Sequence, residues 1–202
     1  MKLKIFAPLS LLILMIACAP STQLIGTWTD PELNGETLQP FNKVLVIARI
    51  SHETSNRIAE DKIVASIKNS AAVPSYSILL QGDTSQAVVD AKLQKEGIDG
   101  LIVMSLKEVN KSLNYQPPTY YGGYYGGYYG YRGYYGYGYG SPGYLTEDQT
   151  FYVETSIYSL VTGKMLWSGT TATLNPKQLE QALDEIITAV RNELSRKGLI
   201  KE

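Results

Sequence analysis

Runs of hydrophobic residues along the chain predict the strands of a β-sheet. Residues 43–50 (KVLVIARI) are apolar at both alternating sets of positions, which is typical of a strand covered on both faces in a mixed or parallel sheet. Residues 101–113 predict one long strand that is buried at first and half-exposed later. Residues 151–158 and 165–174 alternate apolar and polar side chains on either side of a Thr-Gly pair, which predicts a β-hairpin.

The middle of the chain predicts two helices with a short strand between them. Apolar residues recur at helical spacing over residues 56–69, and residues 76–80 form the next short apolar run. The second helix is expected to start from an N-cap at Asp83 and to stop at Gly97. Asp is favoured at an N-cap, and Gly just past the end of a helix.

The C-terminal segment predicts the longest helix. Asn175 is expected as its N-cap and Pro176 as its first residue, a hydrophobic stripe follows over residues 179–194, and Gly198 ends it. The predicted elements follow the order βαβαβ, then a β-hairpin, then a helix. Because parallel crossovers are right-handed, this order predicts an α/β fold with helices packed on a mixed sheet, interrupted by a disordered Gly/Tyr-rich insertion.

The N-terminus has the layout of a secretory signal. Lys2 and Lys4 precede an apolar run over residues 6–16, which is too short for a membrane-spanning helix. The small residue Ala17 follows, and then Cys18, the only cysteine. This ending resembles the lipobox of bacterial lipoproteins, whose cysteine is acylated before the signal is cleaved, although Met15 stands where leucine is commoner. An ordinary signal peptide and an uncleaved anchor are the alternatives.

Composition narrows the classes of partner. Cleavage before Cys18 removes 17 of the 202 residues and leaves 185, enough for one domain with a sizeable core. Loss of the two signal lysines leaves 16 of the 18 basic side chains against 19 acidic ones, a net charge of −3. With no basic cluster, nucleic acid is not an expected partner, and attachment to the membrane rests on the acyl chains. A single cysteine also predicts a fold without disulfides.

These patterns divide the chain into five segments. The predicted boundaries are 1–17 for the signal peptide, 18–40 for a tether with some order near Trp28, 41–112 for the first part of the α/β domain, 113–147 for a Gly/Tyr-rich loop, and 148–202 for the hairpin and last helix that complete the domain.

The Gly/Tyr-rich loop is the most unusual part of the composition. Residues 119–144 hold 12 of the 16 tyrosines and 10 of the 18 glycines, with Arg132 as the only charge. Such a stretch buries no aliphatic side chains and predicts a disordered loop. Tyrosines could also stack on sugars or partner aromatics, or drive self-association. A membrane hairpin is disfavoured, since tyrosine and glycine fall on both faces. The candidate contact residues are Tyr120, Tyr121, Tyr124, Tyr125, Tyr128, Tyr129, Tyr134 and Tyr135.

No set of residues in the sequence forms a recognisable active site. His52 is the only histidine, which excludes a multi-histidine metal site, and no nucleophile elbow or phosphate-binding loop occurs. Glu60 lies on the apolar stripe of its predicted helix, so it needs a partner. Arg57, one turn earlier, is expected to form a structural pair with Glu60, and a backbone donor is the alternative. We therefore expect no catalytic residue, no metal and no enzyme activity.

Several short motifs together resemble small bacterial envelope lipoproteins of uncharacterised function. The motifs span residues 25–112 and 149–200 and are Trp28-Thr29-Asp30-Pro31, FNKVLVIA from Phe41, Arg57-x-x-Glu60-Asp61, Gly97-Ile-Asp-Gly-Leu-Ile-Val, Tyr158-x-x-x-Thr162-Gly163-Lys164-x-x-Trp167 and Gly198-Leu199-Ile200. The order of elements is similar to the periplasmic domain of the curli-secretion channel lipoprotein and to the amino-terminal domain of the Tol-system translocation protein. That resemblance implies an α/β sandwich that binds other envelope proteins, without catalysis or cofactor.

The resemblance also implies an address. In a double-membraned host, Ala19 after the lipidated cysteine implies delivery to the outer membrane, and no acidic cluster follows it that would imply export to the cell surface. We expect a non-enzymatic, lipid-anchored protein that faces the periplasm and acts as an accessory, scaffold or binding module for an envelope protein or glycan. The alternatives are a subunit of an outer-membrane secretion or assembly complex, and a hydrolase that uses His52 or Glu60.

Overall fold

A computed structural model gives the fold of most of the chain. The residues that it describes are 21–33, 38, 40–79, 85–116 and 144–200. Cys18, Asp83 and the eight candidate contact tyrosines lie outside these ranges. The N-cap predicted at Asp83 is wrong, because the second helix starts at Gln86 with Ser85 as its N-cap residue.

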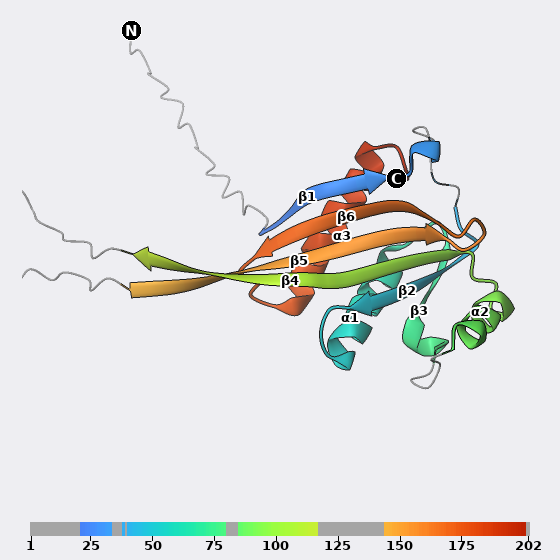
Figure 1. Cartoon of the computed structure of the whole chain (residues 1–202), viewed down its shortest axis with the longest axis horizontal. Coiled ribbons are helices and arrows are strands. Elements are labelled where there is room, and N and C mark those ends of the chain that lie inside the picture. The colour runs from blue at the N-terminus through green and yellow to red at the C-terminus, as the bar shows by residue number, and fades with distance from the viewer. Residues whose placement is uncertain (1–20, 34–37, 39, 80–84, 117–143, 201–202) are drawn as a thin grey trace, which may run out of the picture.

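The described strands form one six-stranded mixed sheet in the order β1-β6-β5-β4-β2-β3 (Figure 1). The strands are β1 (Thr22–Thr29), β2 (Lys43–Arg49), β3 (Ala71–Pro74), β4 (Gly100–Gln116), β5 (Tyr144–Ser159) and β6 (Lys164–Leu174). Strand β2 runs parallel to both of its neighbours, whereas the other pairs are antiparallel. The predicted α/β class with a mixed sheet is confirmed.

Helices cover both faces of the β2 end of the sheet. The helices are α1 (Glu53–Ser66), α2 (Gln86–Lys95) and α3 (Leu179–Arg196), and two short 3₁₀ turns are η1 (Pro31–Leu33) and η2 (Ser75–Ser77). Alternate residues of β2 point to opposite faces: Val44 and Val46 join the cluster with α1 and α3, whereas Leu45 joins the cluster with α2. This explains why residues 43–50 are apolar at both sets of positions.

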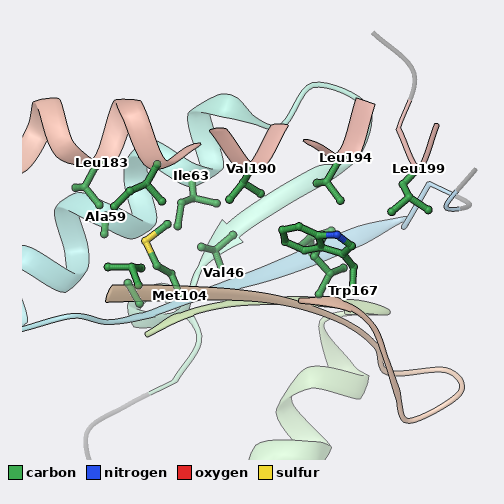
Figure 2. Close-up of a cluster of buried hydrophobic side chains, with 14 residues drawn as sticks. Val46, Ala59, Ile63, Met104, Trp167, Leu183, Val190, Leu194 and Leu199 are labelled. Atoms are coloured by element: carbon green, nitrogen blue, oxygen red, sulfur yellow. The ribbon is translucent and has the colours of Figure 1, made fainter. Parts of the chain in front are cut away.

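The larger core lies between the sheet and the helix pair α1 and α3. Figure 2 shows Leu183, Val190 and Leu194 of α3 facing the sheet, with Trp167 of β6 beneath the C-terminal end of that helix. Trp167 is fully buried. The apolar stripe of α3 therefore supplies one wall of the core, as its helical spacing predicts.

The predicted hairpin and its turn are confirmed. Strands β5 and β6 pair from Thr150–Leu174 to Ser159–Lys164, and Gly163 in the turn between them has a φ of 68°. This left-handed conformation favours glycine because it has no Cβ. The predicted long strand over residues 101–113 is confirmed as β4.

The segment predicted as a tether instead supplies an edge strand. Residues 22–29 form β1, which pairs along β6 and is interrupted by a register shift between Leu24 and Gly26. The polar and glycine residues of this segment are typical of a linker. The segment forms a strand because it pairs with β6, which lies far along the chain. Trp28 on this strand keeps 44% of its surface exposed.

Two predicted boundaries are also wrong. The strand expected at residues 76–80 lies earlier, as β3, where Pro74 is tolerated because β3 is an edge strand. The last helix begins at Leu179 with Gln178 at the N-cap position, and not at Pro176 after an N-cap at Asn175. Asn175 takes a left-handed conformation with a φ of 46°. The Asn175 side chain accepts a hydrogen bond from the Gln149 backbone and donates one to Asp148.

Candidate functional site

Strands β4 and β5 continue as a two-stranded arm past the rest of the sheet (Figure 1). We define the arm as residues 111–116 and 144–149. In these ranges β4 and β5 pair only with each other, since the pairing of β2 ends at Arg49–Ser105 and that of β6 ends at Thr150–Leu174. Six residues per strand at about 3.3 Å each give a projection of about 20 Å. The Gly/Tyr-rich loop is predicted over residues 113–147, but residues 113–116 and 144–147 belong to β4 and β5, so these predicted loop boundaries are wrong.

One face of the arm carries a patch of exposed apolar residues beside the Lys111–Glu147 ion pair (2.9 Å). Leu113, Tyr115 and Leu145 share a face and are 71%, 63% and 66% exposed, and Tyr115 lies directly opposite Leu145. The register places this face in line with Val109 and Phe151, on the side of the sheet that α1 and α3 cover. Ser112, Asp148, Asn114 and Thr146 lie on the opposite face. No described helix covers the apolar face of the arm.

The start of β1 and the arm lie at the same end of the sheet. Thr22, the first residue of β1, pairs with Thr173, which in turn pairs with Phe151, just where the arm begins. Thr22 is four residues after Cys18, so the chain between them spans at most about 14 Å. A lipid on Cys18 would therefore hold this end of the sheet, and the arm with it, close to the membrane.

A second feature is an apolar cavity of about 520 Å³ between the sheet, α1 and α3. Its walls include Val44 of β2, Ile63 of α1, Met104 of β4 and Val190 of α3. The volume lies within the usual range of about 300–1,000 Å³ for small-molecule pockets. Sequence reasoning missed this cavity, since its lining residues come from segments far apart in the chain and each reads separately as a core position.

Glu60 lies in the core with 3% of its surface exposed, but its partners are not those first expected. The Oε1 atom of Glu60 accepts two hydrogen bonds, one from the Ala48 backbone N–H (3.0 Å) and one from the Ser75 hydroxyl (2.7 Å). The Oε2 atom accepts a hydrogen bond from the Ser75 backbone N–H (2.8 Å). Glu60 thereby ties α1 to β2 and to the start of η2. The alternative of a backbone donor is what the structure shows.

Arg57 does not form the predicted pair with Glu60. Its guanidinium donates to Glu53, one turn earlier, and lies 5.0 Å from the centroid of the Tyr76 ring. Arg57 points outward from α1, whereas Glu60 points inward, so the spacing of three residues does not bring their charges together. His52 lies exposed at the N-cap position of α1, and its side chain makes no capping hydrogen bond there.

Asp99 holds the start of β2 against β4. Its carboxylate accepts hydrogen bonds from the backbone N–H groups of Asn42 (2.9 Å) and Lys43 (3.0 Å) and from the Asn42 side chain (2.7 Å). Burial would by itself raise the pKa of Asp99, but these hydrogen bonds outweigh burial and lower the pKa below its ordinary value. The aspartate of the Gly97–Val103 motif therefore has a structural role.

We expect Asp99→Asn to lower the free energy of unfolding by about 1–2 kcal/mol at neutral pH, because the charged acceptor is lost. Because the pKa of Asp99 is lower in the folded state, ionised Asp99 stabilises the fold at pH values above its unfolded-state pKa of about 3.9. This stabilisation is lost as the pH falls through the folded-state pKa. The difference between Asp99→Asn and the wild type should therefore shrink below about pH 4. Urea unfolding of both proteins at pH 7 and at pH 3 measures this difference in the free energy of unfolding. An equal difference at both pH values would contradict the prediction, and Asp90→Asn on exposed α2 is the control.

The described residues contain no group of three or more His, Cys, Asp or Glu side chains placed to hold a metal ion. Among the helices of the same part of the chain, none is both long and apolar enough to cross a membrane.

No family model matches the chain, and no curated protein matches it. Several solved structures resemble it at low sequence identity, among them the following two. A PelC dodecamer from Paraburkholderia phytofirmans has a TM-score of 0.43 and 12% identity, over 89% of this chain and 99% of that one. The lipoprotein GNA1162 from Neisseria meningitidis has a TM-score of 0.41 and 15% identity, over 76% of this chain and 98% of that one. The chain's own residues therefore have to indicate its function.

Proposed function

We propose that this protein is a lipid-anchored, non-enzymatic accessory module of the cell envelope that uses the β4–β5 arm to bind a protein partner at the membrane. The apolar face of the arm is the observation that carries the proposal. Exposed Leu113, Tyr115 and Leu145 lie together on one face of the ribbon, next to the Lys111–Glu147 ion pair. Contiguous apolar residues on one face of a projecting element are typical of an interaction site.

The position of the arm supports a partner at the membrane. Cys18 attaches the chain at the end of the sheet from which the arm projects, so the arm and the Gly/Tyr-rich loop are held where envelope proteins are anchored. The net charge of −3 after cleavage and the paired charges Lys111 and Glu147 on the arm leave little electrostatic attraction for an anionic surface. Apolar and aromatic contact is therefore the expected mode of binding.

The residues considered for catalysis support a non-enzymatic role. Both oxygens of Glu60 are occupied by the donors that fix β2 and η2, so this carboxylate serves the fold. His52 lies exposed at the surface. We propose delivery to the outer membrane with the domain facing the periplasm, on the strength of Cys18 and Ala19.

A second candidate is a subunit of an outer-membrane secretion or assembly complex. The shared location of arm and anchor favours it, because copies held at one membrane could pair through their apolar arm faces. Cross-links that join two copies of this chain would distinguish this function from binding to a different protein.

We expect a photo-cross-linking residue at position 113, in place of Leu113, to capture an envelope protein in whole cells, whereas the same residue in place of Ser112 should capture about tenfold less. The two positions are neighbours on opposite faces, so they differ mainly in which face they present. The double variant Leu113→Ser/Leu145→Ser should reduce the pull-down of the same partner by about tenfold, because hot-spot contacts each contribute about 2 kcal/mol or more. Mass spectrometry identifies the captured proteins.

Three further variants separate the parts of the proposal. Asn110→Ala/Ser112→Ala changes the opposite face and should leave the capture unchanged. Deletion of residues 122–140 tests whether the Gly/Tyr-rich loop adds to the contact. Cys18→Ala should release the protein from the membrane fraction and remove the same cross-links. Equal capture from both faces of the arm, with the domain folded, would refute the arm as the contact surface.

A further inference from the structure

The cavity under α1 and α3 is apolar throughout most of its lining. Its floor is formed by the sheet, where Ile102, Met104 and Ile157 contribute, and its walls by the C-terminal halves of α1 and α3, with Ile63, Val190 and Leu194. Such a lining suits a hydrocarbon chain, because it removes apolar surface from water without offering hydrogen bonds.

One buried polar group interrupts this lining. Thr155 of β5 lines the cavity and is 5% exposed, and its hydroxyl has no hydrogen-bond partner among the described residues. The threonines beside it on β6 are satisfied: Thr171 donates to the Val153 carbonyl, and Thr173 shares a hydrogen bond with Thr22. Buried hydroxyls are normally paired. The Thr155 oxygen is covered in this conformation, and rotation about the Cα–Cβ bond, which exchanges the hydroxyl with the methyl group, would present it to a bound molecule that supplies the partner.

The mouth of the cavity is positively charged. Lys68, just after α1, and Arg191 on α3 line the cavity and are exposed to solvent, and neither forms an ion pair within the part of the chain that the structure describes. No acidic side chain stands among the residues that line the cavity. The protein as a whole has a negative net charge, but Lys68 and Arg191 make the opening of this cavity positive. The opening is therefore complementary to an anionic group.

We propose that the cavity binds a free long-chain fatty acid that carries a hydroxyl group partway along its chain. The hydrocarbon lies against the apolar walls, the hydroxyl pairs with Thr155, and the carboxylate meets Lys68 and Arg191 at the mouth. A single chain is favoured over a diacyl lipid because one cavity of about 520 Å³ is of single-ligand size. The proposal is independent of the arm, which lies beyond the end of this cavity.

Three matched probes test the three recognition elements. The mature lipid-anchored protein is held in nanodiscs, and the fluorescent fatty acid cis-parinaric acid is displaced by ricinoleic acid, oleic acid or oleyl alcohol. Ricinoleic and oleic acid differ only in a mid-chain hydroxyl, and oleyl alcohol lacks the carboxylate. We expect ricinoleic acid to displace the probe at about fivefold to tenfold lower concentration than oleic acid, the gain of one hydrogen bond, and oleyl alcohol to be the weakest.

Variants assign each difference to a residue. Thr155→Val should abolish the preference for ricinoleic over oleic acid, and Lys68→Gln/Arg191→Gln should weaken both acids but not the alcohol. Val190→Trp and Ile187→Phe fill the cavity and should remove probe binding, with circular dichroism confirming that each variant is folded. Lys177→Gln, a cation outside the cavity, and empty nanodiscs are the controls. Equal binding of the three ligands, unchanged binding in the filled variants, or occupation of the cavity by water only would overturn the proposal.

Discussion

Glu60→Ala is expected to lower the free energy of unfolding by about 3 kcal/mol, a large part of the stability of an ordinary domain. The substitution leaves the buried backbone N–H of Ala48 and the partly buried backbone N–H of Ser75 without their shared acceptor. A buried donor left without a partner costs about 1–3 kcal/mol. Urea unfolding followed by far-ultraviolet circular dichroism measures the loss, and the melting temperature should fall with it.

Control substitutions on the same helix separate this effect from a general loss of charge. Glu53→Ala removes an exposed partner of Arg57 and should cost no more than about 0.5 kcal/mol, since exposed ion pairs contribute little. Glu60→Gln keeps the volume and one acceptor oxygen, so its cost should fall between those of Glu53→Ala and Glu60→Ala. A Glu60→Ala protein as stable as the wild type would show that the carboxylate does not hold β2 and η2 together.

The elements that sequence predicted well are those whose signal is local. Residues 43–50 are apolar on both alternating sets because helices cover both faces of β2, and the turn at Gly163 needs the conformation that glycine allows. Strand β1 was missed because its residues are mostly exposed and polar, and pairing with β6 makes it a strand. Asn175 is of a residue type that is favoured at N-caps. Its side-chain oxygen instead accepts a hydrogen bond from the Gln149 backbone N–H, so it does not cap the helix.

The candidate sites show the same division. That Glu60 needs a partner follows from its place on an apolar stripe, but the identity of that partner depends on where β2 and η2 lie in space. The apolar face of the arm also depends on the register of β4 against β5, including the shift between Leu106 and Glu108. A one-residue change of register moves every side chain to the other face, so local pattern alone could not place Leu113.

Gly169 of β6 is the position where one added methyl group should disturb the core most. A Cβ there would press against Cη2 of Trp167 and lie 2.7 Å from Cζ2 of the same ring. Figure 2 shows Trp167 enclosed beneath Leu194 and Leu199. The indole is fully buried, so it has no free space into which it can move, and its contact explains why glycine stands two residues along the strand.

We therefore expect Gly169→Ala to lower the free energy of unfolding by about 2–3 kcal/mol in the wild type and to have almost no effect in a Trp167→Leu background. Leucine removes the ring that the methyl group would meet, so the two substitutions should be coupled by about 2 kcal/mol. Urea unfolding of the four proteins, followed by circular dichroism because the tryptophan changes, gives the coupling. Gly26→Ala on the neighbouring strand, where a Cβ meets no atom within 4 Å, should be nearly neutral. An equal cost of Gly169→Ala in both backgrounds would show that the indole is not what excludes a side chain at this position.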